Sequence, residues 1–214
     1  MPSPELVRKA LNAAKKRPVD YEFFFNQLKS PDWIEPLLRE NLFRHPPAPI
    51  KEGNYIKFPL WPESSYLSRM AGLRPDLVIK VISEIPETEN IRVHEDLADA
   101  ALAMPPAFSA QWIQREIKWL KKQKTLYFSL FPEKLGKLIS HLAKGKQTKV
   151  AMELARVLFD IMPDPKKQTG ADAENELFFS PDPHARFDFW DYQEIVKKDV
   201  PDLVKTAGVE SLNL

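Results

Sequence analysis

His94, Glu95 and Asp96 place an imidazole beside two carboxylates, a combination that serves in acid–base catalysis and metal binding. On a helix, however, consecutive side chains point about 100° apart and do not converge. The residue one turn beyond His94 is Ala98, so the stretch is not the HExxH motif of a metalloprotease. We interpret it as a solvated helix start, and the sequence indicates no catalytic residue.

A second stretch combines Asp182, His184, Asp188 and Asp191, which are side chains that metal ions use as ligands. Asp188 and Asp191 directly precede a short helical pattern, where aspartates commonly cap the helix N-terminus. We therefore predict caps here and no metal site. The sequence also lacks a glycine-rich phosphate loop and a Ser, His and acid arrangement, so we expect no cofactor.

Trp112 and Trp119 are spaced seven residues apart and share one face of a predicted helix. Such a pair could resemble a ligand-binding box. Aromatic residues at helical spacing are more commonly core, so we predict that both rings are buried.

Charge is divided along the chain. Residues 112–149 contain ten Lys or Arg against two acids, and residues 160–202 contain eleven acids against five bases, within a formal net charge of +1. The basic region could bind nucleic-acid phosphates, dock the chain's own acidic tail, or form an ordinary solvated face. The candidates for nucleic-acid binding are Arg115, Lys118, Lys121, Lys122 and Lys124.

The elements that position these residues are amphipathic helices separated by prolines. Leu135, Leu138, Ile139 and Leu142 follow the i, i+3, i+4, i+7 spacing of one helix face, and a second apolar stripe runs from Val150 to Ile161. We expect these two stripes to bury against each other. The predicted helices are residues 4–16, 21–28, 30–38, 63–72, 75–85, 91–104, 106–122, 131–144 and 147–162, with Pro18 ending the first run.

The helices group into pairs whose corners lie at Ser30, Arg74, Pro105 and Gly145. The intervals between corners are uneven but average close to 40 residues, the period of HEAT or armadillo-like repeats. We therefore predict an all-α fold in which residues 1–162 form an α-α superhelix of stacked helical hairpins.

Residues 43–62 are rich in proline and carry Tyr55, Phe58 and Trp61 at intervals of three. This spacing is typical of a polyproline-like strand, so we predict an extended strap over neighbouring helices. The alternative is a ligand for an SH3 or WW domain. The chain has only six glycines, which disfavours β-hairpins, and we expect a strand content close to nil.

Residues 163–214 form an acidic and aromatic tail with short helices. We expect it to fold back over the last hairpin, with its acids near Lys144, Lys146 and Lys149. The predicted apolar anchors are Phe178, Phe179, Phe187, Phe189 and Trp190. Apolar residues at the end of the sequence also suggest a piece of a longer protein.

The sequence contains no cysteine, which fits a reducing cytoplasmic location. Its first residues interleave charged and apolar side chains, unlike a signal peptide, and no apolar run is long enough to span a membrane.

The runs YEFFFNQLKSPDWIEPLLREN, FRHPPAPIKEGNYIKFPLWPESSYLSRMA and IRVHEDLADAALAMPP resemble the N-terminal segment of large, uncharacterised bacterial proteins with HEAT-like helical repeats. The resemblance covers about residues 20–165 and implies a scaffold at the front of a longer polypeptide. It supplies no catalytic residue. We therefore expect a non-catalytic module that binds a protein partner or another domain of the same polypeptide, with nucleic-acid binding as the alternative.

Overall fold

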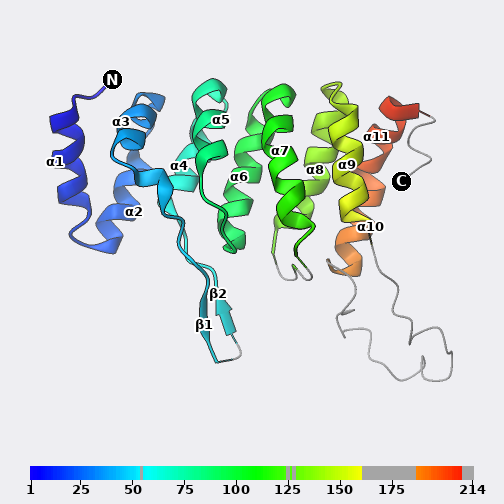
Figure 1. Ribbon diagram of the computed structural model, residues 1–214, viewed down its shortest axis with the longest axis horizontal. Helices are drawn as coiled ribbons and strands as arrows, with labels where there is room; N and C mark the ends of the chain where they lie inside the picture. The colour runs from blue at the N-terminus through cyan, green and yellow to red at the C-terminus, as the bar shows by residue number, and fades with distance from the viewer. Residues whose placement is uncertain (54, 124–125, 127–128, 161–186, 209–214) are drawn as a thin grey trace. The chain divides into compact units, whose positions relative to one another are not determined.

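The computed structural model describes residues 1–53, 55–123, 126, 129–160 and 187–208. Over these residues the chain is mostly α-helical, which confirms the all-α class, and its strands form one two-stranded sheet (Figure 1). The chain divides into two compact units, Met1–Trp112 and Ile113–Leu214. The division falls within a helix, whereas the composition changes near residue 162.

The first unit begins with helices and contains the sheet. Its elements are α1 (Pro4–Ala14), α2 (Pro18–Gln27), η1 (Pro31–Trp33), α3 (Ile34–Arg39), η2 (Leu42–Arg44), β1 (Ile50–Glu52), β2 (Tyr55–Lys57), α4 (Pro62–Met70), α5 (Pro75–Glu84) and α6 (Ile91–Ala103). Helix α7 (Pro106–Leu120) crosses the division between the units. The second unit continues with α8 (Phe131–Lys144), α9 (Thr148–Leu158), α10 (Phe189–Lys198) and α11 (Val200–Ala207).

Proline starts many of these helices, because its fixed φ suits the first turn and its missing N–H has no intrahelical partner there. Ser3 caps α1 before Pro4, since its hydroxyl accepts a hydrogen bond from the Leu6 amide at 3.2 Å. Pro18 is the first residue of α2, so the interpretation of Pro18 as a terminator alone was incomplete.

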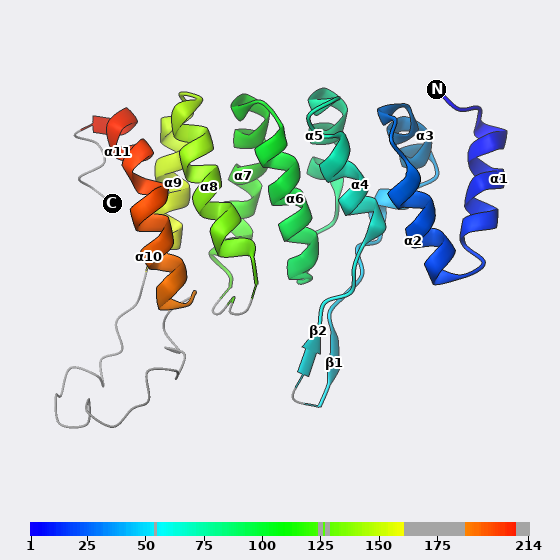
Figure 2. The same cartoon turned by 180° about the vertical axis from the view of Figure 1, so that it is seen from behind.

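Helix α4 is the centre of packing in the first unit, and it contacts both α2 and α6. In the view from behind, α4 lies between these two helices (Figure 2). Phe25 of α2 and Tyr66 of α4 are fully buried, with ring centroids 6.1 Å apart. The Tyr66 hydroxyl donates to the Ser30 carbonyl at 2.8 Å, which satisfies its polar end inside the core.

Helices α8 and α9 bury their apolar stripes against each other, as predicted. Leu135, Leu138 and Leu142 of α8 are fully buried, and Leu154 and Leu158 of α9 are too. The last position of the second stripe, residue 161, lies outside the described residues.

Helices α10 and α11 pack on α8. Phe187 is fully buried, but Phe189 and Trp190 are 70% and 67% exposed, so their predicted role as anchors was wrong. Among the described residues of this part of the chain, Tyr192, Ile195 and Leu203 are also buried. The Lys144 ammonium lies 2.9 Å from the Asp202 carboxylate, and Phe178 and Phe179 lie outside the described residues.

The predicted strap is wrong for Ile50–Glu52 and Tyr55–Lys57, which are the two strands of a β-hairpin. Strands β1 and β2 are antiparallel, with Ile50 opposite Lys57, Lys51 opposite Ile56 and Glu52 opposite Tyr55. Gly53 has a φ of 60°, the left-handed conformation that a two-residue loop requires. One well-placed glycine therefore outweighs the low glycine content of the whole chain.

None of the helices in the described ranges is both long and apolar enough to cross a membrane.

Candidate functional site

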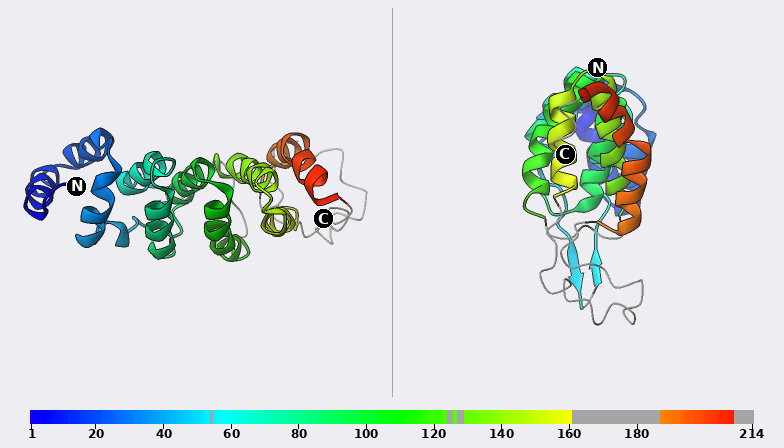
Figure 3. Two further views of the ribbon diagram at one scale, coloured as in Figure 1. Left: turned by 90° about the horizontal axis from the view of Figure 1, so that it is seen from above. Right: turned by 90° about the vertical axis from the view of Figure 1, so that its right-hand side faces the viewer.

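The hairpin, which we define as residues 48–58, extends beyond the helix ends of the first unit (Figure 3). Both strands are exposed at every described position. Tyr55 is 81% exposed, Ile56 54% and Ile50 45%, and Leu60 near its base is also exposed. Apolar side chains therefore gather on an element whose backbone is itself accessible, which is typical of a contact surface.

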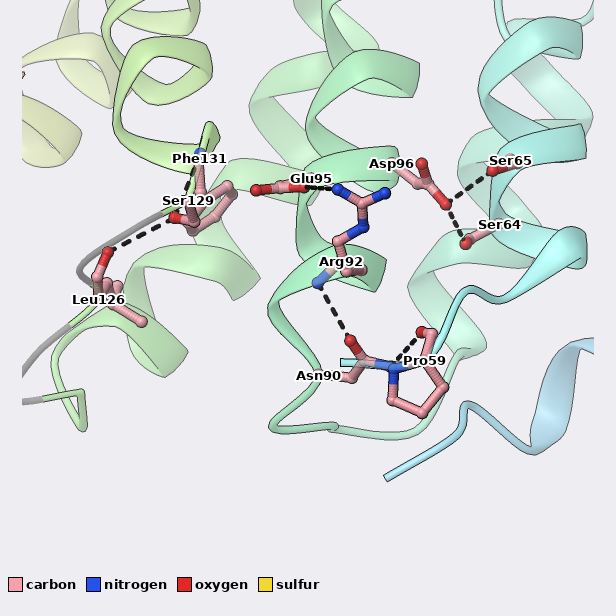
Figure 4. A network of polar contacts seen from close by, with 10 residues as sticks. All are labelled: Pro59, Ser64, Ser65, Asn90, Arg92, Glu95, Asp96, Leu126, Ser129 and Phe131. Carbon is pink, nitrogen blue, oxygen red and sulfur yellow. Dashed lines mark hydrogen bonds and ion pairs between the residues drawn. The ribbon is translucent and has the colours of Figure 1, made fainter. Parts of the chain in front are cut away.

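Asn90 holds the two ends of the hairpin. Its side-chain nitrogen donates to the Pro47 carbonyl at 3.0 Å and to the Pro59 carbonyl at 2.8 Å. The Asn90 side-chain oxygen accepts from the Arg92 amide at 3.1 Å and so caps α6 (Figure 4). The residue is fully buried, and both polar atoms of its side chain make hydrogen bonds.

The start of α6 is fixed by further polar contacts. The Thr88 hydroxyl accepts from the Asn90 amide at 3.1 Å, and His94 Nε2 donates to the Thr88 carbonyl at 2.9 Å. His94 and Glu95 are both buried, so the prediction of a solvated helix start was wrong for them. The reason is tertiary, because α6 packs inside the first unit and a helix pattern alone does not show which of its faces is covered.

Asp96 joins α6 to the first turn of α4. Its Oδ2 accepts hydrogen bonds from the Ser64 hydroxyl at 2.5 Å and from the Ser65 hydroxyl at 3.0 Å (Figure 4). The Glu95 carboxylate lies 3.6 Å from the Arg92 guanidinium. The side chains of His94, Glu95 and Asp96 therefore make separate contacts and do not converge, as the helix geometry predicts.

Glu63 joins the start of α4 to α2. The Tyr21 hydroxyl donates to Glu63 Oε1 at 2.6 Å, while Oε2 has no hydrogen-bond partner among the described residues. Burial raises the pKa of the Glu63 carboxyl, and the Tyr21 hydrogen bond opposes this change. Burial, with the Glu63 hydrogen bond as a second cause, also raises the pKa of Tyr21.

The basic candidates lie in the second unit. Lys118 on α7 is exposed, Lys121 and Lys122 just beyond its end are exposed, and Arg115 is half-buried. Lys124 lies outside the described residues. Two other bases of the region have acidic partners, Lys137 with Glu133 at 2.6 Å and Lys144 with Asp202 at 2.9 Å.

The sequence predicts that Asp188 and Asp191 cap a helix and that no metal site is present. Asp188 caps α10, because its Oδ1 accepts from the Trp190 amide at 3.0 Å. Asp182 and His184 lie outside the described residues, and within those that are described no group of His, Asp or Glu side chains could hold a metal ion.

Trp112 and Trp119 are buried as predicted.

Sequence reasoning missed the hairpin and its support by Asn90. The available signal was Gly53-Asn54 between two apolar-containing segments, a two-residue combination typical of hairpin turns. No sequence signal marks the bonds from Asn90 to Pro47 and Pro59, because these prolines lie 43 and 31 positions away in the chain.

The sequence matches no family model, and neither a curated protein nor a solved structure matches the chain.

Proposed function

We propose that the chain is a non-catalytic protein-interaction module in which HEAT-like stacked helical hairpins carry the exposed β-hairpin. Its partner is another protein or another domain of the same polypeptide, in a bacterial cytoplasm. The observation that carries the proposal is the exposure of Ile50, Tyr55 and Ile56 on the hairpin. Removing such side chains from water on binding is favourable, by about 25 cal/mol per Å² of apolar surface.

The attachment of the hairpin ends by Asn90 supports the proposed role of the hairpin in binding a partner. Asn90 fixes both ends of the hairpin to the start of α6 through bonds to Pro47 and Pro59. A contact element with fixed ends loses less conformational freedom on binding than a free loop does.

The test is affinity capture followed by cross-linking, with wild-type chain and the triple variant Ile50→Ser, Tyr55→Ser and Ile56→Ser. The wild type should retain a protein that the triple variant loses. Leu73→Ser is a matched control, because Leu73 is 59% exposed in the same unit but lies away from the hairpin in sequence. Equal capture by wild type and triple variant would contradict the proposal.

The alternative function is binding of a nucleic-acid backbone through Arg115, Lys118, Lys121, Lys122 and Lys124. The exposure of three of these lysines around the end of α7 favours it. It predicts salt-sensitive, sequence-tolerant gel shifts that are lost in Lys118→Glu, Lys121→Glu, Lys122→Glu. Lys80→Glu, at an exposed lysine of α5, is the control. Absence of any shift at low salt would rule this alternative out.

A further inference from the structure

The sheet has two strands within the described chain, so each strand has a free edge. A lone two-stranded hairpin is marginally stable in water, and a third strand or a packed surface stabilises it. A free, accessible edge is also a template for pairing with another strand. The identity of the added strand can be inferred from the residues at each edge.

The hairpin register determines which backbone groups face outward. In an antiparallel hairpin closed by a two-residue loop, the pair beside the loop is hydrogen-bonded and the next pair is not. Glu52 and Tyr55 form the pair beside the loop, so Lys51 and Ile56 form the next. The N–H and C=O of Ile56 therefore point away from β1 and are available at the free edge of β2.

The free edge of β2 is complementary to itself. If two copies pair antiparallel about a two-fold axis at Ile56, Ile56 of one copy faces Ile56 of the other, and their outward N–H and C=O groups form two hydrogen bonds. Tyr55 of each copy then faces Lys57 of the other. This places an apolar pair at the centre and an ammonium beside an aromatic ring on either side.

The free edge of β1 lacks this complementarity. The same two-fold pairing about Lys51 would place two lysines directly opposite each other, which is destabilising. It would also place Ile50 opposite Glu52. The charge pattern therefore distinguishes two edges that are similar in length and exposure.

We propose that a second copy of this chain binds along the free edge of β2 and forms a four-stranded sheet in the order β1-β2-β2-β1. This inference rests on the proposed role of the hairpin as an interaction element and names its partner. Paired strands this short bury less than the roughly 1,200 Å² of stable interfaces, so the dimer is weak and concentration-dependent.

Sedimentation equilibrium of the whole chain over a wide concentration range tests this dimer. Ile56→Pro removes an N–H that points outward, so it should abolish self-association and leave the hairpin intact. Lys51→Pro is the matched control, because it removes the equivalent N–H at the edge of β1 and should leave the dimer unchanged. A wild-type chain that stays monomeric, or a dimer that survives Ile56→Pro, overturns the inference.

Disulfide trapping provides a second test, since the chain has no cysteine of its own. Residues facing each other in a hydrogen-bonded pair have Cα atoms about 5.5 Å apart, within the range of a disulfide. Ile56→Cys should therefore oxidise to a covalent dimer faster than Lys51→Cys, and the reverse order would contradict the pairing. If the chain is monomeric but captures another protein through the hairpin, the self-pairing fails and the proposed function remains.

Discussion

The hairpin and the α10–α11 pair are attached to their helices in opposite ways. The hairpin is held at its root, where Asn90 bonds to Pro47 and Pro59, and its apolar side chains remain exposed. Helices α10 and α11 are held along their length on α8, with Ile195 and Leu203 buried. The first arrangement leaves a surface available for a partner, whereas the second uses its apolar surface for stability.

The largest expected effect comes from breaking the root of the hairpin. Asn90→Ala removes the cap of α6 and the two donors to the proline carbonyls, so it should lower the free energy of unfolding by about 2–4 kcal/mol. Urea denaturation measures the change. Ser3→Ala is the matched control, because Ser3 supplies a cap alone and its loss should cost about 1 kcal/mol. Equal losses in both variants would show that the proline bonds contribute nothing.

The second effect tests the attachment along α8. A Cβ at Gly136 would lie 2.6 Å from Asp199 Oδ2 and 2.8 Å from Ile195 Cγ1. Gly136→Ala should therefore push α10 away and cost about 1–3 kcal/mol, although alanine favours a helix more than glycine does.

Gly72→Ala is the control for this substitution, because a Cβ there would meet only the Ala103 carbonyl oxygen, at 3.4 Å. Thermal unfolding should show a clear loss for position 136 and little change for position 72. A stabilised Gly136→Ala would mean that the contact between α10 and α8 is loose.

The third effect is a rise in the free energy of unfolding on replacing Glu63, which lies at the start of α4 just beyond the hairpin. Since burial raises the pKa of Glu63, its protonated form stabilises the fold below the ordinary value of 4.5, and this contribution is lost as the pH rises through the folded-state pKa. Glu63→Gln keeps the acceptor for Tyr21 without the charge. It should raise the stability at neutral pH by about 1 kcal/mol, with the difference vanishing in acid.

Urea denaturation across the acid to neutral range measures this gain. Glu22→Gln, at an exposed position of α2, is the control for the loss of a carboxylate from the surface and should change the stability little. A Glu63→Gln variant that is less stable than the wild type at neutral pH would show that the ionised carboxylate is stabilising.

The smallest effect concerns the polar contact that accompanies the apolar attachment of α11. The Ser140 hydroxyl, followed by the Lys144 ammonium, lowers the pKa of Asp202, so this stabilisation is present above the ordinary value of 3.8 and lost as the pH falls through the folded-state pKa. Asp202→Asn should change the melting temperature only slightly, and less at high salt. If Asp202→Asn lowered the stability as much as Asn90→Ala does, α11 would be held mainly by its polar contact and not by its buried apolar residues.

Local signals made the helices predictable. Helix α8 spans Phe131–Lys144, and both ends agree with the range predicted from its proline start and its apolar stripe. The hairpin was missed because a low glycine count was applied to the whole chain, although one glycine with a φ of 60° at position 53 is sufficient. The burial of His94 and the exposure of Trp190 depend on which helices pack together, and a single sequence does not reveal that.

The two bonds of Asn90 also determine how freely the hairpin can vary. The Pro47 and Pro59 carbonyls accept from one nitrogen, at 3.0 and 2.8 Å, so the chain leaves and re-enters the helices at nearly the same point. Lengthening a loop between such fixed ends costs little, about 0.6 kcal/mol for each doubling of its length. Residues 48–58 are therefore a natural position for insertion or exchange, where a different sequence would leave the helices folded.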